Sequence, residues 1–370
     1  MDKAPLLLCV AAAAIGLGTS RMRAQEMAAE PGNPVLVAAD NPSFDYEGRI
    51  DTSDPKGPVL VWEASTASID FTGESVWVLF GRATGTVFFD VSVDGTTSIL
   101  ELKGTDKDVC DRLTAKGPGM HHLRIFKRSE GAAGSARFGG VRLARGARTQ
   151  KPAAARRLRF EIYGDSITAG ACDEDGPSDQ WDTRRTHNSA FSWAALTSAA
   201  YSADYRNISV SGIGLAAGYD DVLEGQIWDR IYPTADAPKA DLTQWVPDAV
   251  FVLLGDNDDS WPRDKKHPFP ADFIEKYSDF IHNLRGAYPK AQIVLLNGAM
   301  WAGVNSDWLG PKWNAAVKGL EATDPNVHHF TFAHWTMNHP RVSDHRILAD
   351  ELDKWLATQP FMASLAPGQP

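Results

Sequence analysis

The chain has 370 residues, a hydrophobic fraction of 43%, a charged fraction of 23% and a formal net charge of −10. This length exceeds one typical small core and is enough for two domains. The negative charge argues against a surface built to bind nucleic acid or an anionic membrane, because both would repel it.

The beginning of the chain has the pattern of an export signal. Lys3 supplies a positive charge, a short apolar run ends at Gly18, and small or polar residues follow. The run is too short to span a bilayer, so we expect a cleaved signal peptide over residues 1–25 and no membrane span. The signal pattern therefore predicts a secreted or periplasmic protein. Residues 26–45 are polar, rich in Pro and Ala, and expected to form a lead-in.

Residues 46–145 predict an all-β domain. Short apolar segments alternate with polar positions, and Asp94-Gly95 is typical of a tight turn between two strands. The segments are PVLVWEASTASIDFTG, SVWVLFGR, TVFFDVSVDG, HHLRIFKRSE and ARFGGVRLAR. Several short strands with turn signals and no helical period favour an antiparallel β-sandwich.

Residues 146–157 lack large apolar side chains and are expected to be a linker. From residue 158 the pattern alternates between buried strands and helices, which favours a parallel sheet with helices on both faces over residues 158–358. Residues 359–370 are expected to be a tail. The segments that carry the alternation are LRFEIYGDS, SAFSWAALTSAAYSA, YRNISVSGIG, PDAVFVLLGDND, AQIVLLNGAM and SDHRILADELDKWL.

Two cysteines remain after removal of the predicted signal. Cys110 falls in the predicted β-sandwich and Cys172 in the α/β domain. In an oxidising compartment they can form a bridge that ties the domains together, or both can stay as thiols.

Four polar segments follow or precede the predicted elements of the α/β domain. Three of them end strands: Gly164-Asp165-Ser166, Ser211-Gly212-Ile213-Gly214 and Gly255-Asp256-Asn257-Asp258. Asn338-His339-Pro340 precedes the last helix. Because ligands bind at the carboxyl ends of parallel strands, these segments can converge there. Together they supply a hydroxyl nucleophile, backbone and amide donors, and an imidazole base, which is the minimum set for acyl transfer through a serine.

These blocks resemble the SGNH (GDSL-type) hydrolase superfamily. The matching segments are YGDSITAG, SVSGIG, LGDND and NHPRVSDHRILADEL. The N-terminal half, above all HHLRIFKRSEGAAGSARFGGVRL, is similar to carbohydrate esterase family 2, in which a jelly-roll sandwich precedes an SGNH domain. The likeness covers roughly residues 45–357. It implies an α/β three-layer domain preceded by a jelly-roll sandwich, and removal of acetyl groups from polysaccharides.

The resemblance also implies roles for individual residues. Ser166 is the nucleophile and His339 the base. The N–H groups of Ser166 and Gly212 and the side-chain amide of Asn257 form the oxyanion hole, with Gly214 as the alternative to Gly212. Such donors act on charge that develops only as the reaction proceeds.

One position departs from the superfamily pattern. An Asp usually stands three residues before the His, and here that position is Thr336. Some family members work with a Ser–His dyad and a carbonyl, so Thr336, Asn338 or a backbone carbonyl is the expected partner that orients His339. The competing interpretation is a copy that has lost much of its activity.

The remaining candidates concern the cleft and metals. Trp301 and Trp335 follow the active strands and are candidate walls of a sugar-binding cleft. The pairs His121-His122 and His328-His329 lack ligand partners at metal-site spacing, so neither a metal nor an organic cofactor is expected.

The leading hypothesis is a secreted esterase that removes O-acetyl groups from polysaccharide of the xylan or glucomannan type. Two alternatives stand beside it: a general GDSL-type esterase or lipase, and a carbohydrate-binding protein with a decayed catalytic domain.

Overall fold

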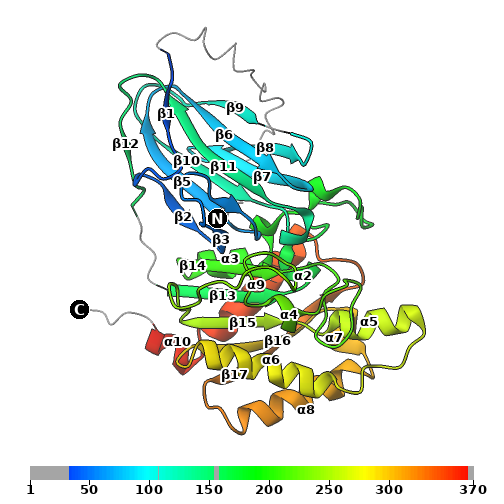
Figure 1. Ribbon diagram of the computed structural model, residues 1–370. Helices are drawn as coiled ribbons and strands as arrows, with labels where there is room; N and C mark the ends of the chain where they lie inside the picture. The colour runs from blue at the N-terminus through cyan, green and yellow to red at the C-terminus, as the bar shows by residue number, and fades with distance from the viewer. Residues whose placement is uncertain (1–32, 107, 154–157, 366–370) are drawn as a thin grey trace, which may run out of the picture.

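The computed structural model describes residues 33–106, 108–153 and 158–365, which form a β-sandwich and an α/β domain (Figure 1). The expected signal peptide over residues 1–25 lies outside the described residues. None of the helices in the described residues has the length and apolar character needed to cross a membrane.

The β-sandwich consists of two antiparallel sheets whose inner faces share one core. Alternate residues of its strands are buried, as the alternating sequence pattern predicts. One sheet contains β3 (Ile50–Asp51), β4 (Val59–Leu60), β11 (Ala136–Leu143), β6 (Ser75–Ala83) and β9 (Val109–Thr114), with β1 (Val35–Val37) paired to β11. The other contains β12 (Thr149–Gln150), β5 (Thr66–Thr72), β10 (Met120–Lys127), β7 (Thr86–Val93) and β8 (Thr96–Lys103), with β2 (Asp45–Glu47) paired to β5.

The α/β domain is built on a five-stranded parallel sheet with the order β14-β13-β15-β16-β17. Successive residues of a central strand face opposite sides: Val250 and Val252 join one core, Phe251 and Leu253 the other. This explains why the strand sequence is apolar throughout. The strands are β13 (Leu158–Gly164), β14 (Ala203–Ser209), β15 (Ala249–Leu253), β16 (Gln292–Met300) and β17 (Val327–Thr336).

Helices cover both faces of this sheet. On one face α6 (Phe273–Ala287) and α8 (Leu309–Glu321) bury their apolar sides, and on the other α3 (Trp193–Ala200) and α9 (Val342–Leu356) do so. The expected fold class is therefore confirmed. The shorter helices are α2 (Ser166–Ala169), α4 (Glu224–Ile227), α5 (Asp256–Lys265), α7 (Trp301–Asn305), α10 (Pro360–Leu365), η1 (Gly131–Ala133), η2 (Arg184–Thr186) and η3 (Ser189–Phe191).

Three short elements lie in segments that the sequence assigned to connections. Strand β1 falls in the expected lead-in, β12 in the expected linker and α10 in the expected tail. Strands of two or three residues are too short to show a period of two, so β1 and β12 have no local signal in the sequence. They are held by pairing to longer strands, β1 to β11 and β12 to β5.

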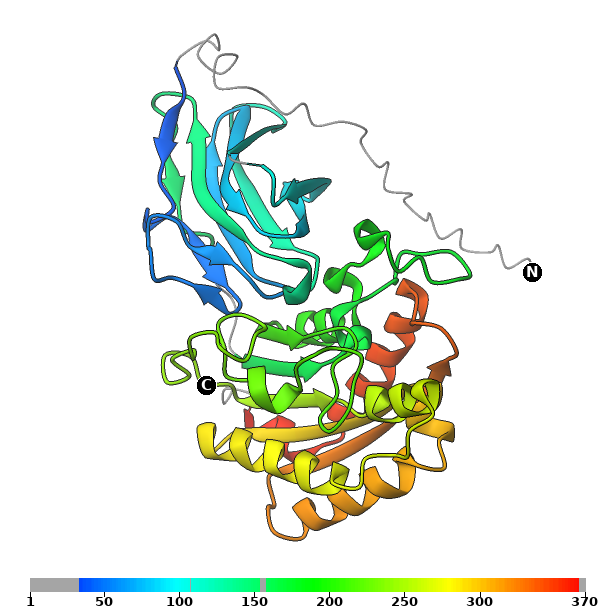
Figure 2. The ribbon, with the colours of Figure 1, turned by 45° about the vertical axis from the view of Figure 1, so that its right-hand side comes forward.

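Cys110 and Cys172, the cysteines within the described part of the chain, are not joined by a disulfide. Cys110 is part of β9 in the β-sandwich, whereas Cys172 is buried just after α2 in the α/β domain. The end of the β-sandwich formed by β10 and η1 rests on the α/β domain, beside the segment that follows α2 (Figure 2).

Candidate active site

The candidate residues lie in loops at one edge of the parallel sheet. Ser166 is the first residue of α2, directly after β13, and Asn257 lies in the first turn of α5 after β15. His339 lies between β17 and α9. Because β13, β15 and β17 run parallel, their carboxyl ends meet at the same edge. Arg341 donates to the carbonyl oxygens of His339 and Cys172, at 2.8 and 3.1 Å, so the histidine lies beside the segment that follows the serine turn.

Asp165 joins the loop of Ser166 to the loop of Asn257. Its Oδ1 accepts a hydrogen bond from the N–H of Ile167 at 3.0 Å, which caps α2 and fixes the turn that presents Ser166. Its Oδ2 accepts from Nδ2 of Asn257 at 3.1 Å. Burial raises the pKa of Asp165 to about 7 despite the hydrogen bond from Ile167. Asp165 therefore organises the loops around the nucleophile candidate.

Asn257 and Asp258 bind the loop that follows β14. Asn257 Nδ2 also donates to the carbonyl oxygen of Ile213 at 2.9 Å, so the amide group has two protein acceptors in this structure. Donation to a substrate oxygen requires Asn257 to release one of them. The Asp258 carboxylate accepts from three consecutive N–H groups, those of Leu215, Ala216 and Ala217.

The two glycines of the 211–214 loop have different structural roles. Gly212 has φ of +84°, in the left-handed region that favours glycine, and a Cβ there would come to 3.0 Å from Cβ of Tyr219. A Cβ on Gly214 would lie 1.7 Å from the carbonyl oxygen of Ala217, so this residue permits close packing of the loop. The loop thus has a fixed backbone at the edge of the sheet.

The partner of His339 is Asp179, a residue that the sequence pattern did not single out. Oδ2 of Asp179 lies 2.7 Å from Nδ1 of His339 and also accepts from the His339 N–H at 3.3 Å. Arg341 forms an ion pair with Oδ1 at 2.8 Å. Burial acts to raise the pKa of Asp179, but His339 and Arg341 outweigh it and hold the pKa well below its usual range. Asp179 is therefore a carboxylate at neutral pH.

The orienting role expected for Thr336 or Asn338 is not supported by the contacts. The Thr336 hydroxyl donates to the carbonyl oxygen of Asn338 at 2.5 Å, and the Asn338 amide donates to that of Pro177 at 3.2 Å. Neither side chain is the partner of the His339 ring. The acid comes instead from the long polar segment after α2, where several carboxylates stand close together in sequence and no pattern distinguishes Asp179 from its neighbours.

Aromatic side chains surround this edge of the sheet. The Trp181 ring lies 5.5 Å from the His339 ring at an angle of 32°, and 37% of Trp181 is exposed. The candidate cleft residue Trp335 has the same exposure at the end of β17. Trp301 is half-buried, with the Arg263 guanidinium 5.6 Å from its ring. Trp181 is the tryptophan that contacts the histidine, and it was missed because it lies in the same polar segment as Asp179.

One cluster of potential metal ligands exists in the described residues. Single ligand atoms of Cys172, Asp179 and His339 lie within 4.8 Å of one another. The last two are hydrogen-bonded to each other, and Arg341 adds a positive charge beside Asp179. Burial raises the pKa of the Cys172 thiol to about 12, which disfavours the thiolate that binds metals. The cluster fits an imidazole–carboxylate pair better than a metal site.

The histidine pairs singled out in the sequence have other partners. His121 contacts Asp94 and His122 contacts Asp70, whereas His329 contacts Glu321. His328 contacts Gln292.

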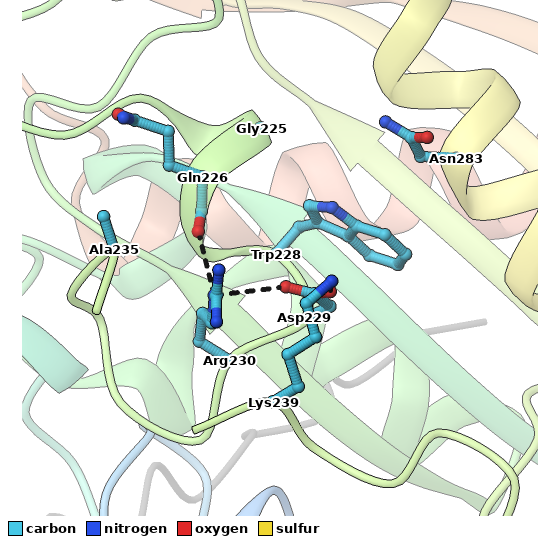
Figure 3. A pocket seen from close by; sticks show the side chains of 8 residues that line it. All are labelled: Gly225, Gln226, Trp228, Asp229, Arg230, Ala235, Lys239 and Asn283. Carbon is cyan, nitrogen blue, oxygen red and sulfur yellow. Dashed lines mark hydrogen bonds and ion pairs between the residues drawn. The ribbon is translucent and has the colours of Figure 1, made fainter. Parts of the chain in front are cut away.

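A separate hollow of about 370 Å³ lies beside α4 (Figure 3). It is lined by charged side chains, among them Asp229, Arg230 and Lys239, together with Trp228. Asp229 forms ion pairs with both basic residues. None of the lining residues belongs to the segments that carry Ser166, Asn257 or His339.

The fold and the arrangement of these loops define an SGNH-type α/β domain joined to a jelly-roll sandwich. The family model of the GDSL-like Lipase/Acylhydrolase family matches residues 162–355, which is more than half of the chain. The chain belongs to this family. Residues 46–152 match the model of the carbohydrate esterase 2 N-terminal domain.

Curated relatives share both domains. The chain is 29% identical over 324 residues to the cellulase/esterase CelE of Acetivibrio thermocellus, covering 85% of this chain and 39% of that protein. It thus spans about two fifths of the length of this relative. It is 26% identical to an acetylxylan esterase / glucomannan deacetylase of Cellvibrio japonicus, covering 79% of this chain and 83% of the relative.

A solved structure shows the same two-domain arrangement. The structure of an active-site mutant of a family two carbohydrate esterase from Clostridium thermocellum superposes with a TM-score of 0.77 at 26% identity, covering 86% of this chain and 99% of that one. A second structure of a family two carbohydrate esterase from that organism was solved in complex with cellohexaose.

Proposed function

We propose that this protein is a secreted serine esterase that removes O-acetyl groups from polysaccharides of the xylan or glucomannan type. The observation that carries the proposal is the His339–Asp179 pair at the same sheet edge as Ser166. An acid-paired imidazole beside a serine at a helix start is the machinery of acyl transfer.

Ser166 attacks the acetyl carbonyl carbon in this mechanism, and His339 takes the proton from the serine hydroxyl. Asp179 holds Nδ1 of the ring, which leaves the other ring nitrogen for the proton, and stabilises the positive charge that forms. The tetrahedral intermediate collapses to an acetyl-serine, and the sugar hydroxyl leaves with the proton from His339. Water then attacks the acetyl-serine by the same sequence, which releases acetate.

The N–H groups of Ser166 and Gly212 are the proposed donors to the oxyanion. The Ser166 N–H lies in the first turn of α2, where backbone N–H groups lack helical acceptors. Gly212 presents its peptide from a loop fixed by Asp258 and by the left-handed conformation of the glycine. Asn257 is the third donor if it exchanges the Ile213 carbonyl for the substrate oxygen. This exchange would occur only when negative charge develops.

Support for an acetylated polysaccharide comes from the relatives and from the exposed aromatic rings. The Cellvibrio relative is named an acetylxylan esterase / glucomannan deacetylase, and one structural neighbour was solved with cellohexaose. Trp181 beside His339 and Trp335 at the end of β17 offer flat apolar faces of the kind that pack on sugar rings. Secretion is proposed from the signal pattern over residues 1–25.

The substrate class is tested by comparing acetate release from acetylated xylan and glucomannan with hydrolysis of soluble esters of increasing acyl length. We expect acetyl esters to be preferred and acetate to be released from at least one polysaccharide. A preference for long acyl chains would contradict the polysaccharide assignment and favour a lipase. The variant His339→Ala should be inactive on every ester, whereas Trp335→Ala should lose activity on the polysaccharide only.

A further inference from the structure

Four consecutive polar residues of the β-sandwich are buried against the α/β domain. Lys127, Arg128, Ser129 and Glu130 are each no more than 4% exposed. Charged side chains are rarely buried to this extent unless they are paired. This is the KRSE segment of the motif that most resembles carbohydrate esterase family 2, and the proposed chemistry assigns it no role.

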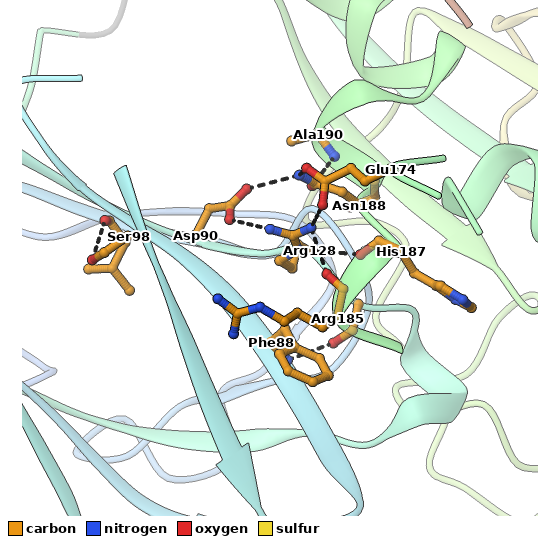
Figure 4. Close-up of polar contacts among 12 residues, drawn as sticks. Phe88, Asp90, Ser98, Arg128, Glu174, Arg185, His187, Asn188 and Ala190 are labelled. Carbon is orange, nitrogen blue, oxygen red and sulfur yellow. Dashed lines mark hydrogen bonds and ion pairs between the residues drawn. The ribbon is translucent and has the colours of Figure 1, made fainter. Parts of the chain in front are cut away.

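Arg128 fastens the segment after α2, which carries Asp179 and Trp181. It pairs with Asp90 of β7 at 2.9 Å and with Glu174, and it donates to the carbonyl oxygen of Arg185 at 2.8 Å (Figure 4). The Arg128 carbonyl accepts from the N–H of Ser189 at 3.0 Å. A single buried guanidinium therefore holds both ends of this segment to the β-sandwich.

Glu130 reaches two parts of the candidate active site at once. Its Oε2 accepts a hydrogen bond from the N–H of Ser211 at 2.7 Å, one residue before the proposed donor Gly212. Its Oε1 pairs with Arg184. The Arg184 guanidinium lies 4.7 Å from the ring centre of Trp181, whose ring packs on His339. The Glu130 carboxylate thus contacts the oxyanion loop directly, and it is connected to His339 through Arg184 and Trp181.

The position of Glu130 is itself fixed from the β-sandwich. The Lys127 ammonium donates to the carbonyl oxygens of Ser129 and Glu130 at 2.7 and 2.9 Å. Glu63 accepts from the N–H of Gly131 at 3.0 Å and from that of Ser209, at the end of β14, at 2.9 Å. Two glutamates of the β-sandwich therefore hold alternate N–H groups of the chain that leads into the oxyanion loop.

From these contacts we infer that Glu130 is a positioning residue for the reaction, supplied by the β-sandwich to the α/β domain. It fixes the peptide before Gly212 and, through Arg184 and Trp181, the face of His339. The inference rests on the proposed function. An oxyanion donor interacts with charge that exists only in the transition state, and displacement by a fraction of an ångström weakens that interaction. Loss of Glu130 therefore lowers kcat and leaves KM nearly unchanged.

The test compares Glu130→Ala and Glu130→Gln with two controls in the purified full chain, using a soluble acetyl ester. Asp90→Asn weakens the same domain interface through Arg128 without touching the 209–214 loop. Glu101→Gln neutralises a glutamate of the same domain on the edge strand β8, where it pairs with Lys103. We expect kcat of Glu130→Ala to fall roughly 10- to 100-fold, the range for a misplaced catalytic group. Glu130→Gln keeps an acceptor for the Ser211 N–H and should recover most of this loss.

The controls separate positioning from folding. Both control variants should retain kcat to within about threefold, even if Asp90→Asn lowers the midpoint of thermal unfolding. The inference is overturned if Glu130→Ala keeps wild-type kcat, or if kcat falls in proportion to the unfolding midpoint in Asp90→Asn and Glu130→Ala alike. Failure of the proposed function is seen separately, as wild-type protein without Ser166-dependent hydrolysis of the ester.

Discussion

Replacement of Asp179 tests the part of the active site that the sequence did not reveal. In Asp179→Ala, Nδ1 of His339 loses its 2.7 Å acceptor, and the ring is free to rotate or to adopt the other tautomer. Arg341 stays in place because it also donates to the carbonyl oxygens of Gly176 and His339, both at 2.8 Å. The perturbation therefore acts chiefly on the ring and the backbone N–H of His339.

The expected magnitude follows from the kind of hydrogen bond that is lost. A hydrogen bond to a charged group contributes about 1.5–3 kcal/mol. The Asp179 and His339 side chains are 26% and 18% exposed, so solvent screens the pair only in part. A loss of about 2–3 kcal/mol of transition-state stabilisation lowers kcat roughly 30- to 150-fold. KM should change little, because the Asp179–His339 hydrogen bond stabilises charge that forms in the transition state rather than in the bound substrate.

The assay is initial-rate hydrolysis of an acetyl ester by wild type, Asp179→Ala, Asp182→Asn and Thr336→Ala. Asp182 is an exposed carboxylate of the same segment and serves as the matched control. Both Asp182→Asn and Thr336→Ala should keep nearly full activity. The reasoning is refuted if Asp179→Ala retains activity within threefold of wild type, or if Thr336→Ala loses as much as Asp179→Ala.

Three further predictions concern the loops and the ionisable groups. Gly212→Ala should lower both kcat and the unfolding midpoint, because an L-residue at φ of +84° costs about 1–2 kcal/mol; unchanged values of both would contradict the strained loop. Burial raises the pKa of Asp165 to about 7, so protonation of this carboxyl stabilises the folded state in full below its unfolded pKa, and this contribution is lost as pH rises through 7. The unfolding midpoint should therefore fall between pH 5 and pH 8. The fall should be smaller in Asp165→Asn, which has no carboxyl group to titrate at this position. An equal fall of the unfolding midpoint in wild type and in Asp165→Asn would rule out Asp165 as the cause of the pH dependence. Prolonged dialysis against a chelator should leave ester hydrolysis unchanged, whereas a loss restored by added zinc would assign the cluster around Cys172 to a metal.

The sequence predicted the architecture well because its signals are local and periodic. Strands buried on both faces give continuous apolar runs such as Ala249–Leu253, and the sandwich strands alternate with period two. The loops that carry Ser166, Gly212 and Asn257 follow such strands directly, so their place at the carboxyl edge of the sheet follows from the parallel topology.

The contacts that complete the site have no such local signal. Asp179 lies 160 positions before His339, and Glu130 lies 81 positions before Ser211. Both meet their partners only through the tertiary fold, and each stands among other charged residues that look equivalent in sequence. The two interpretations of Thr336, a dyad or a decayed site, depended on local spacing. The structure places the carboxylate of Asp179, from a distant segment, against the His339 ring.

The central claim is that Ser166 carries the acetyl group, and acetate release from acetylated xylan or glucomannan by wild type and Ser166→Ala tests it most directly. The two proteins should have the same unfolding midpoint to within a few degrees. Wild type should release acetate in proportion to enzyme concentration, and Ser166→Ala should release none above the uncatalysed rate. Equal release by both proteins, or none by either on any acetylated substrate, would contradict the account.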